Sequence, residues 1–225
     1  EINSCQNLRQ VKDLKPNYYL PFAGTYALSG KLASLDKIRG VPNIDQAHEY
    51  ILKNQTFSKP IKINPGSSFD LISESYSNEY KKFNLNEYRY YVENILAKKK
   101  LDYEEDPIPT FDELYELSKT AYIKFLDKKL INNVEIKTDI YIDVEKKYIK
   151  LPKNSETLEI VEKKNFTRKE KYILYKTDLR LLKRLLMGPR YAHWNNAEIG
   201  SHIKFYRNPD VFERELYSSM CYFHN

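Results

Sequence analysis

The sequence predicts two successive units, an α/β unit followed by an α+β unit in which helices cover one side of an antiparallel sheet. Over residues 18–66, a short apolar run, a loop, an amphipathic helix and a second apolar run follow one another. Strict alternation of apolar and polar residues in 134–144 predicts a half-buried strand. The charged, proline-containing stretch 98–109 separates these patterns and places the boundary near residue 105, giving domains 1–105 and 106–225.

In the first domain, the apolar run 18–23 predicts a strand that leads into a loop at Gly24. Asn43 and Gln46 have the spacing of a capping box, which predicts a helix over 44–54. A second strand is expected at 60–64, before the Pro65-Gly66 turn. Residues 72–83 predict a loop, and Asn84 predicts the start of a helix whose apolar face holds Leu85, Tyr88, Val92, Ile95 and Leu96.

The second domain begins with a long helix, which Thr110 and Glu113 cap as a capping box. Pro209 predicts the first position of a final helix. Between them the patterns predict strands at 134–144, 148–151, 157–161 and 171–176, a helix capped by Thr177 and stopped at Gly188-Pro189, and a last strand at 199–206.

The charge pattern indicates an ordinary solvated surface. The net charge is +6, from 37 basic and 31 acidic residues that alternate in sign along the chain, which argues against nucleic-acid binding. The two cysteines, Cys5 and Cys221, are too few for a disulfide framework and favour a reducing, cytoplasmic compartment. No apolar run reaches the length of a membrane span, and the polar first residues do not resemble a signal peptide. The start at Glu1 instead of Met predicts a trimmed or processed chain.

The motifs predict no complete catalytic site. The four histidines lack the spacing of a zinc site, so no metal is expected within this chain. The loop 24–31 differs from a phosphate-binding loop because five residues separate its glycines and no hydroxyl residue follows Lys31. Lys31 and Arg39 remain candidates for contact with an anionic substrate, whereas the glycines equally suit turn geometry.

Residues 190–202 have the most unusual composition in the chain. Trp194 is the only tryptophan, and Asn195 and Asn196 follow it. A binding role would use Trp194 for stacking and Asn195 for hydrogen bonding. A structural role, which we favour, would use the indole to cover the core and the asparagines as a turn. Cys221 lies in a helical pattern and is interpreted as an inert thiol.

Residues 1–80 resemble the closing segment of a metallo-β-lactamase fold, through YYLPFAG, SGKLASLDKIRGVP, IDQAHEYI and PIKINPGSSFDL. The resemblance is to a branch that includes lactonase-like enzymes and relatives of cytidine-monophosphate sialic acid hydroxylase. That family binds metal through an early HxHxDH motif, which is absent here. The resemblance therefore implies that zinc or iron belongs to a missing N-terminal half. Asn64 stands near the point where that family often has a histidine ligand, and Phe22, Gly24, Lys31 and Arg39 would form one wall of the active site.

Residues 106–225 resemble a sterol-carrier-protein type-2 domain in the order of their elements, above all in the stretch 175–212. Such domains bind lipids or act as appended dimerisation and lid modules, and they follow some metallo-β-lactamase-type hydrolases. The aromatic and polar loop at 190–196 departs from that pattern.

Together these features predict the C-terminal portion of a metal-dependent hydrolase-like protein, whose catalytic residues are unknown. The expected contacts to a small-molecule substrate are Gly24, Lys31, Arg39, Trp194 and Asn195. The expected partner is the missing N-terminal half, homo-oligomerisation stays open, and no membrane span is expected. The alternative is a non-catalytic lipid-binding or oligomerisation module, which an apolar tunnel lined by Leu181, Leu185 and Phe205 would favour.

Overall fold

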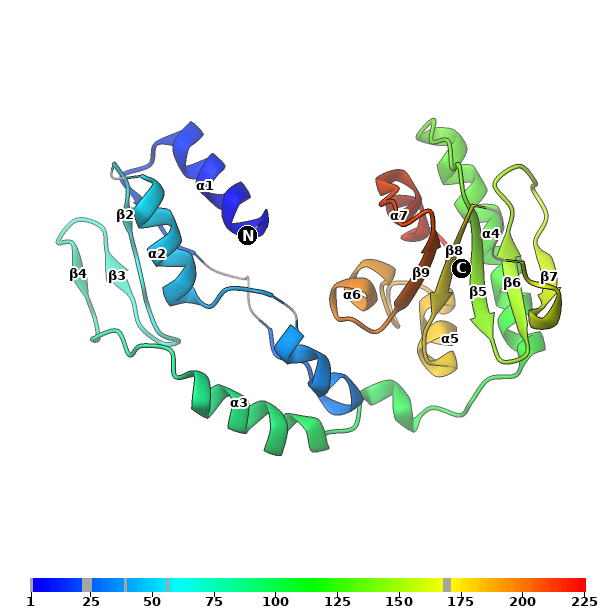
Figure 1. Ribbon diagram of the computed structural model, residues 1–225, viewed down its shortest axis with the longest axis horizontal. Helices are drawn as coiled ribbons and strands as arrows, with labels where there is room; N and C mark the ends of the chain where they lie inside the picture. The colour runs from blue at the N-terminus through cyan, green and yellow to red at the C-terminus, as the bar shows by residue number, and fades with distance from the viewer. Residues whose placement is uncertain (1, 22–25, 39, 56, 168–170) are drawn as a thin grey trace. The chain divides into compact units, whose positions relative to one another are not determined.

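The computed structural model describes residues 2–21, 26–38, 40–55, 57–167 and 171–225 (Figure 1). The chain divides into two compact units, Glu1–Lys100 and Leu101–Asn225. Among the described residues, 8 of the buried apolar side chains belong to the first unit and 28 to the second, so the main core lies in the second unit. No helix among the described residues is long and apolar enough to cross a membrane.

The first unit combines helices with two small sheets. The strands β1 and β2 pair in parallel, with Tyr18 opposite Lys59. β3 and β4 form an antiparallel hairpin, of which β4 lies in the expected loop 72–83. In chain order the elements are α1 (Ile2–Leu14), β1 (Tyr18–Tyr19), η1 (Gly30–Ile38, a 3₁₀ helix), α2 (Ile44–Asn54), β2 (Lys59–Pro60), β3 (Phe69–Asp70), β4 (Ser75–Tyr76), α3 (Leu85–Asn94) and η2 (Leu96–Lys98, 3₁₀).

Both predicted helix starts in this unit are confirmed. The side chain of Asn43 accepts from the Gln46 amide at 2.9 Å, and the Gln46 side chain accepts from the Asn43 amide at 3.0 Å, which completes the capping box of α2. Asn84 caps α3 by accepting from the Glu87 amide at 3.2 Å. Each cap satisfies amides that the first turn leaves unpaired and stabilises its helix by about 1 kcal/mol.

The strands of the first unit are shorter than predicted. Each member of the β1–β2 pair has a single partner strand among the described residues, and Pro60 has no amide hydrogen to extend the ladder. Apolar side chains remain exposed, including Ile38 at 73% and Ile72 at 96%. A small buried cluster of Ala33, Val92 and Leu96 joins η1, α3 and η2. The core of this unit is therefore thin.

The second unit is a five-stranded sheet with helices on one face. The strand order is β7-β6-β5-β8-β9. The elements are η3 (Asp102–Glu105, 3₁₀), α4 (Phe111–Ile131), β5 (Asp139–Val144), β6 (Lys147–Leu151), β7 (Glu159–Glu162), η4 (Lys163–Asn165, 3₁₀), β8 (Tyr172–Lys176), α5 (Leu179–Met187), α6 (Trp194–Ile199), β9 (Lys204–Asn208) and α7 (Arg214–Met220).

The sheet is mixed, so the expectation of an antiparallel sheet is wrong at one pair of strands. β5 and β8 run parallel, with Ile140 opposite Ile173, whereas the other three pairs are antiparallel. After the β5-β6-β7 meander, the chain returns to the end where β5 begins and adds β8 on the free side of β5 (Figure 1). The sequence pattern does not reveal this crossover, because the alternation of apolar and polar residues within each strand does not depend on which strands pair.

β5 is buried along its whole length, so the prediction of a half-buried strand at 134–144 is also wrong. Ile140 and Ile142 face the main core. Tyr141, on the opposite face, is covered by Phe166 with ring centroids 5.0 Å apart. The strand also begins later than expected, because Lys137 and Thr138 bind the side chain of Glu213 instead of a neighbouring strand.

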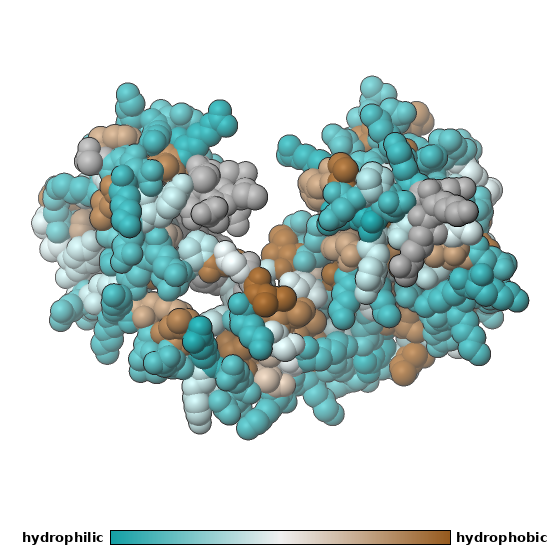
Figure 2. All heavy atoms as spheres, viewed as in Figure 1, coloured by the Kyte–Doolittle hydropathy of each residue, from teal (hydrophilic) through white to brown (hydrophobic). Residues whose placement is uncertain are grey.

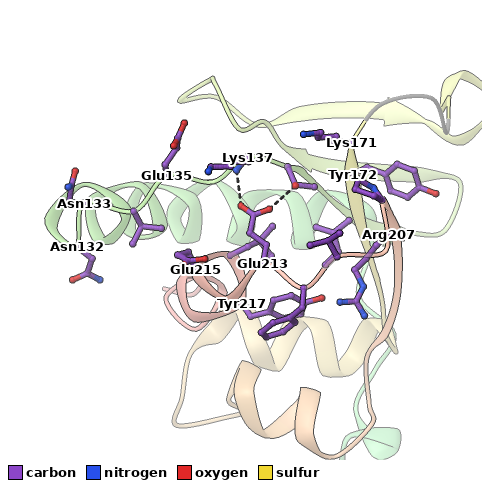
Figure 3. Close-up of a pocket in the computed structure, with 17 residues that line it drawn as sticks. Asn132, Asn133, Glu135, Lys137, Lys171, Tyr172, Arg207, Glu213, Glu215 and Tyr217 are labelled. Atoms are coloured by element: carbon purple, nitrogen blue, oxygen red, sulfur yellow. Dashed lines mark hydrogen bonds between the residues drawn. The ribbon is translucent and has the colours of Figure 1, made fainter.

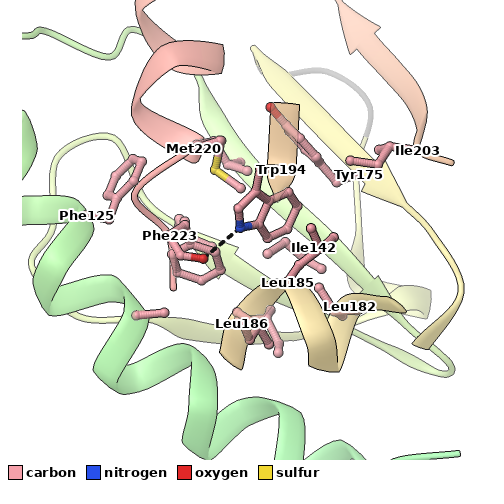
Figure 4. Packing of buried hydrophobic residues seen from close by; sticks show 14 of the residues in the cluster. Phe125, Ile142, Tyr175, Leu182, Leu185, Leu186, Trp194, Ile203, Met220 and Phe223 are labelled. Carbon is pink, nitrogen blue, oxygen red and sulfur yellow. Dashed lines mark hydrogen bonds between the residues drawn. The ribbon is translucent and has the colours of Figure 1, made fainter. Parts of the chain in front are cut away.

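The main core lies between one face of the sheet and the helices (Figure 4). α4 packs against α5 and α7, and all three contribute buried side chains to the same cluster as the sheet. Arg180 and Arg184 of α5 hold η3: Arg180 Nη1 donates to the Glu104 carbonyl at 2.7 Å, and Arg184 Nη1 donates to the Asp102 carboxylate at 2.7 Å. These bonds place residues 101–105 with the second unit.

Three local predictions for this unit are wrong. Asp178, not Thr177, caps α5, since its carboxylate accepts from the Arg180 amide while Thr177 Oγ1 donates to the His202 carbonyl. The final helix begins at Arg214, after the segment that starts at Pro209. The expected asparagine turn is instead part of the helix α6, where His193 Nδ1 accepts a hydrogen bond from the Asn195 amide.

Candidate functional site

The first unit contains a groove of about 610 Å³ between η1, the start of α2, and α3. Most of its lining comes from residues 26–46, a segment that includes two of the expected substrate contacts, Lys31 and Arg39. The lining residues are Tyr26, Ala27, Ala33, Ser34, Asp36, Lys37, Gly40, Val41, Asn43, Ile44, Gln46, Phe83, Leu85, Tyr88, Arg89, Val92, Glu93 and Ala97. Grooves of this size accommodate small organic molecules.

The floor of this groove is apolar. Val92 of α3 and Ala33 of η1 are buried, and the partly buried Ala27 and Tyr88 pack against them. This packing follows from the sequence, because Tyr88 and Val92 are four residues apart and therefore share one face of α3. Figure 2 shows further apolar side chains on the surface of this unit among hydrophilic ones.

Asp36 organises one wall of the groove. Its carboxylate accepts a hydrogen bond of 2.8 Å from the Tyr88 hydroxyl and one of 3.1 Å from the Leu28 amide. These two bonds join η1 to α3 and to the loop before η1. Hydrogen bonds to an ionised group are stronger than neutral ones, so the Tyr88 ring is held in a defined position.

Charged groups stand at the rim. Lys37, Arg89 and Glu93 line the groove and are exposed. Asn43 and Gln46 bind each other's backbone in the capping box, and Asp36 is engaged by Tyr88 and Leu28. The other charged groups of the lining are Lys37, Arg89 and Glu93. An apolar floor with a charged rim suits a small molecule that has an apolar body and an ionised substituent.

The expected substrate residues of the first unit are only partly described. Lys31 lies on η1, is exposed and does not line the groove. Gly24 and Arg39, together with Phe22, lie outside the described residues. Lys37 and Arg89 are groove cations that sequence reasoning missed. Arg89 carried a detectable signal, since it follows Leu85 by one helical turn on the face that lines the groove.

Trp194 and Asn195 belong to the second unit. The indole of Trp194 is 3% exposed, and its Nε1 donates to the Phe223 carbonyl at 2.8 Å (Figure 4). Its ring packs near Tyr175 and Phe223, with centroids about 6 Å away. Asn195 is exposed at the start of α6. Trp194 thus fills the core of the second unit. The expected substrate contacts Lys31 and Trp194 therefore belong to different units.

No group of three or more histidine, cysteine, aspartate or glutamate side chains among the described residues is placed to hold a metal. Asn64, near the expected position of a family ligand, instead binds the backbone of Lys81. Its Nδ2 donates to the Lys81 carbonyl at 3.1 Å, and its Oδ1 accepts from the Lys81 amide at 2.7 Å.

Burial, followed by the charge of Lys62, lowers the pKa of His48. Burial raises the pKa of the Cys221 thiol, which therefore keeps its proton at neutral pH.

Comparisons with known proteins add no relative. No protein-family model, no curated protein and no solved structure matches this chain. Function therefore has to be inferred from the chemistry of the two units themselves.

Proposed function

We propose that this chain is the C-terminal portion of a metal-dependent, hydrolase-like protein of the metallo-β-lactamase superfamily. In this proposal the first unit supplies one wall of the substrate site, and the second unit is an accessory domain. The observation that carries the proposal is the groove whose lining comes mostly from residues 26–46, the segment with the family resemblance. Its apolar floor and charged rim suit a small-molecule substrate.

The thin core of the first unit supports the same proposal. Its parallel pair β1–β2 has two residues in each strand, and parallel strands occur almost only in sheets covered on both faces. Exposed apolar side chains such as Ile38 and Ile72 remain on its surface. A partner segment that covered them and extended the sheet would bury area worth about 25 cal/mol per Å². We infer that this partner is the N-terminal half of the same fold.

The catalytic metal is proposed to be zinc or iron, bound by ligands of that N-terminal half. The described residues of this chain offer no fitting set of ligands. A bound metal of this kind activates water for attack on the substrate. The residues of this chain would orient the substrate, with the Tyr88 ring and Val92 against its apolar body and Lys37 and Arg89 beside its ionised group.

The alternative, a lipid-binding module, gains no supporting observation. Leu181 and Leu185 are buried in the main core. Phe205 packs between the rings of Tyr175 and Tyr217, at centroid distances of 4.9 and 5.4 Å. An apolar tunnel lined by these three residues would have favoured the alternative, but they contact other side chains of the core.

The experiment is hydrolysis of a panel of lactones and esters by the full-length gene product, with and without a chelator. We expect activity that the chelator abolishes, and a raised KM in a Lys37→Ala, Arg89→Ala double variant. Lys53→Ala, an exposed cation of α2 that does not line the groove, is the matched control. Activity that survives complete metal removal would contradict the proposal.

A further inference from the structure

The second unit has its own groove, of about 720 Å³, at the end of the sheet where β9 finishes and β5 begins (Figure 3). α7 and the segment after α4 form its other sides. It is lined by Asn132, Asn133, Val134, Glu135, Lys137, Thr138, Lys171, Tyr172, Ile173, Arg207, Pro209, Val211, Phe212, Glu213, Glu215, Leu216 and Tyr217. The proposed role of the unit as an accessory domain does not account for this groove.

One wall is held in place by Glu213. Its carboxylate accepts from the Lys137 amide at 2.8 Å and from the Thr138 hydroxyl at 2.7 Å (Figure 3). These bonds fix the segment after α4 against the start of α7. They also engage both carboxylate oxygens of Glu213, which reduces its repulsion of an anion in the groove.

Tyr217 brings an unused donor to the groove. Its side chain is 8% exposed, and its hydroxyl has no hydrogen-bond partner in the part of the chain that the structure describes. Burial raises the pKa of this phenol, so the hydroxyl keeps its proton and can donate. Phe212 stacks on the ring, with centroids 4.6 Å apart and planes at 24°, and holds it in place.

Arg207 lies beside Tyr217, with its guanidinium carbon 6.0 Å from the centre of the phenol ring. Its Nε contacts the carboxylate of Asp210 at 3.2 Å, but Asp210 is 88% exposed and solvent screens that pair. Glu198 is half-buried, and burial raises the pKa of its carboxyl. The positive charge of Arg207 opposes part of that rise. The terminal nitrogens of Arg207 remain suited to bidentate contact with an oxyanion.

We propose that this groove binds a small organic oxyanion, with a carboxylate or phosphate group held by the Arg207 guanidinium and the Tyr217 hydroxyl. The apolar side chains of Val134, Phe212 and Leu216 would contact the body of the ligand. The remaining charges of the lining are Lys137 and Lys171 against Glu135 and Glu215. A cationic ligand is disfavoured beside Arg207, because the guanidinium carries a positive charge and has no acceptor.

The test is calorimetric titration of this chain with phenyl phosphate, benzoate, inorganic phosphate and benzylamine, at about 0.15 M salt, where nonspecific charge effects are screened. We expect saturable binding of one or both aromatic anions, weaker binding of inorganic phosphate because it has no apolar body, and none of benzylamine. Benzylamine binding at least as tight as the anions, or no saturable binding of any anion, would overturn the proposal.

Two variants locate the site. Tyr217→Phe keeps the ring and removes one neutral donor, so affinity should fall about three- to tenfold. The midpoint of thermal unfolding should stay the same or rise, because the hydroxyl makes no hydrogen bond to the described residues. Arg207→Met removes a charged donor pair and should weaken binding about tenfold or more.

The matched controls are Tyr206→Phe on β9 and Arg214→Met on α7, whose parent residues are exposed and do not line the groove. Both should bind the anions as the wild type does.

If Arg207→Met does not fold, the Tyr217→Phe variant alone tests the assignment of the site. Unchanged affinity in Tyr217→Phe, or an equal loss in Tyr206→Phe, would overturn the assignment. None of these results depends on metal content. A negative result here would therefore contradict the anion site without contradicting the proposed hydrolase function.

Discussion

The indole Nε1 of Trp194 donates a hydrogen bond of 2.8 Å to the carbonyl oxygen of Phe223. Trp194 begins α6, and Phe223 follows α7 near the C-terminal end of the chain. Because both side chains are almost fully buried, the bond fastens the last residues to the core. The most unusual segment of the sequence therefore secures the fold of the second unit.

Replacement of Trp194 should destabilise the second unit. Trp194→Phe removes indole volume and leaves the Phe223 carbonyl without its donor, for a combined cost of roughly 2–4 kcal/mol. Urea unfolding followed by far-UV circular dichroism measures this cost. Asn195→Ala, at the exposed neighbouring position, should stay within about 0.5 kcal/mol of wild type. Equal effects of the two substitutions would show that Trp194 does not anchor the core.

Gly188 and Gly40 offer a matched test of backbone conformation and space. Both have positive φ, +109° and +62°, but a Cβ on Gly188 would lie 3.1 Å from the Asn225 carbonyl oxygen, whereas Gly40 has open space. We expect Gly40→Ala to cost about 1 kcal/mol through backbone strain alone. Gly188→Ala should cost roughly 1–3 kcal/mol more, because steric crowding adds to that strain. Thermal unfolding that ranks the two variants in the opposite order would refute this account.

The hydrogen bond from Tyr88 to Asp36 should stabilise the groove of the first unit. Tyr88→Phe removes the donor while keeping the ring, so we expect a loss of about 1–2 kcal/mol in local stability. Hydrogen exchange of the amides in 28–36 and 85–92 measures it, since faster exchange reports local opening. Tyr90→Phe on the same helix, where the side chain is 64% exposed, should leave exchange unchanged. A Tyr88→Phe variant with wild-type exchange would indicate that the bond does not hold this wall.

The ion pair of Asp106 with Arg184 predicts a pH-dependent contribution to stability. Hydrogen bonding from Arg184 holds the pKa of the Asp106 carboxyl below its usual value. A lowered pKa in the folded state stabilises the fold above the unfolded value of about 3.9, and this contribution disappears as the pH falls through the folded value.

Asp106→Asn should therefore destabilise the chain at about pH 7, and its difference from wild type should shrink at about pH 3. Urea unfolding at the two pH values measures this. Asp127→Asn, on the exposed side of α4, is the control and should show little effect at either pH. A cost that grows on acidification would contradict the sign of the effect.

Local signals in the sequence predicted local structure well. The capping boxes at Asn43 and Thr110 and the cap at Asn84 mark true helix starts, because each depends on a side chain and an amide three residues away. The parallel pairing of β5 with β8 was missed, because it depends on a long-range crossover. β5 was expected to be half-buried because nothing local indicates that Phe166 covers Tyr141.

The candidate sites were harder to predict than the elements. Substrate contacts were expected at Gly24, Lys31 and Arg39, but Lys31 does not line the groove and the other two lie outside the described residues. The cations that line the groove are Lys37 and, from a separate helix, Arg89. The second groove escaped detection because Arg207 and Tyr217, ten residues apart, meet only when β9 and α7 pack together. Rarity of composition was a poor guide, since the unusual Trp194 lies in the core.

The most direct test of the central claim is the metal content of the full-length gene product, purified without added metal and measured by mass spectrometry. The account predicts roughly one or two equivalents of zinc or iron per chain, bound by residues outside the present sequence. This chain, expressed alone, should retain none. A full-length product that carries no metal and gains none on reconstitution would contradict the assignment to a metal-dependent hydrolase.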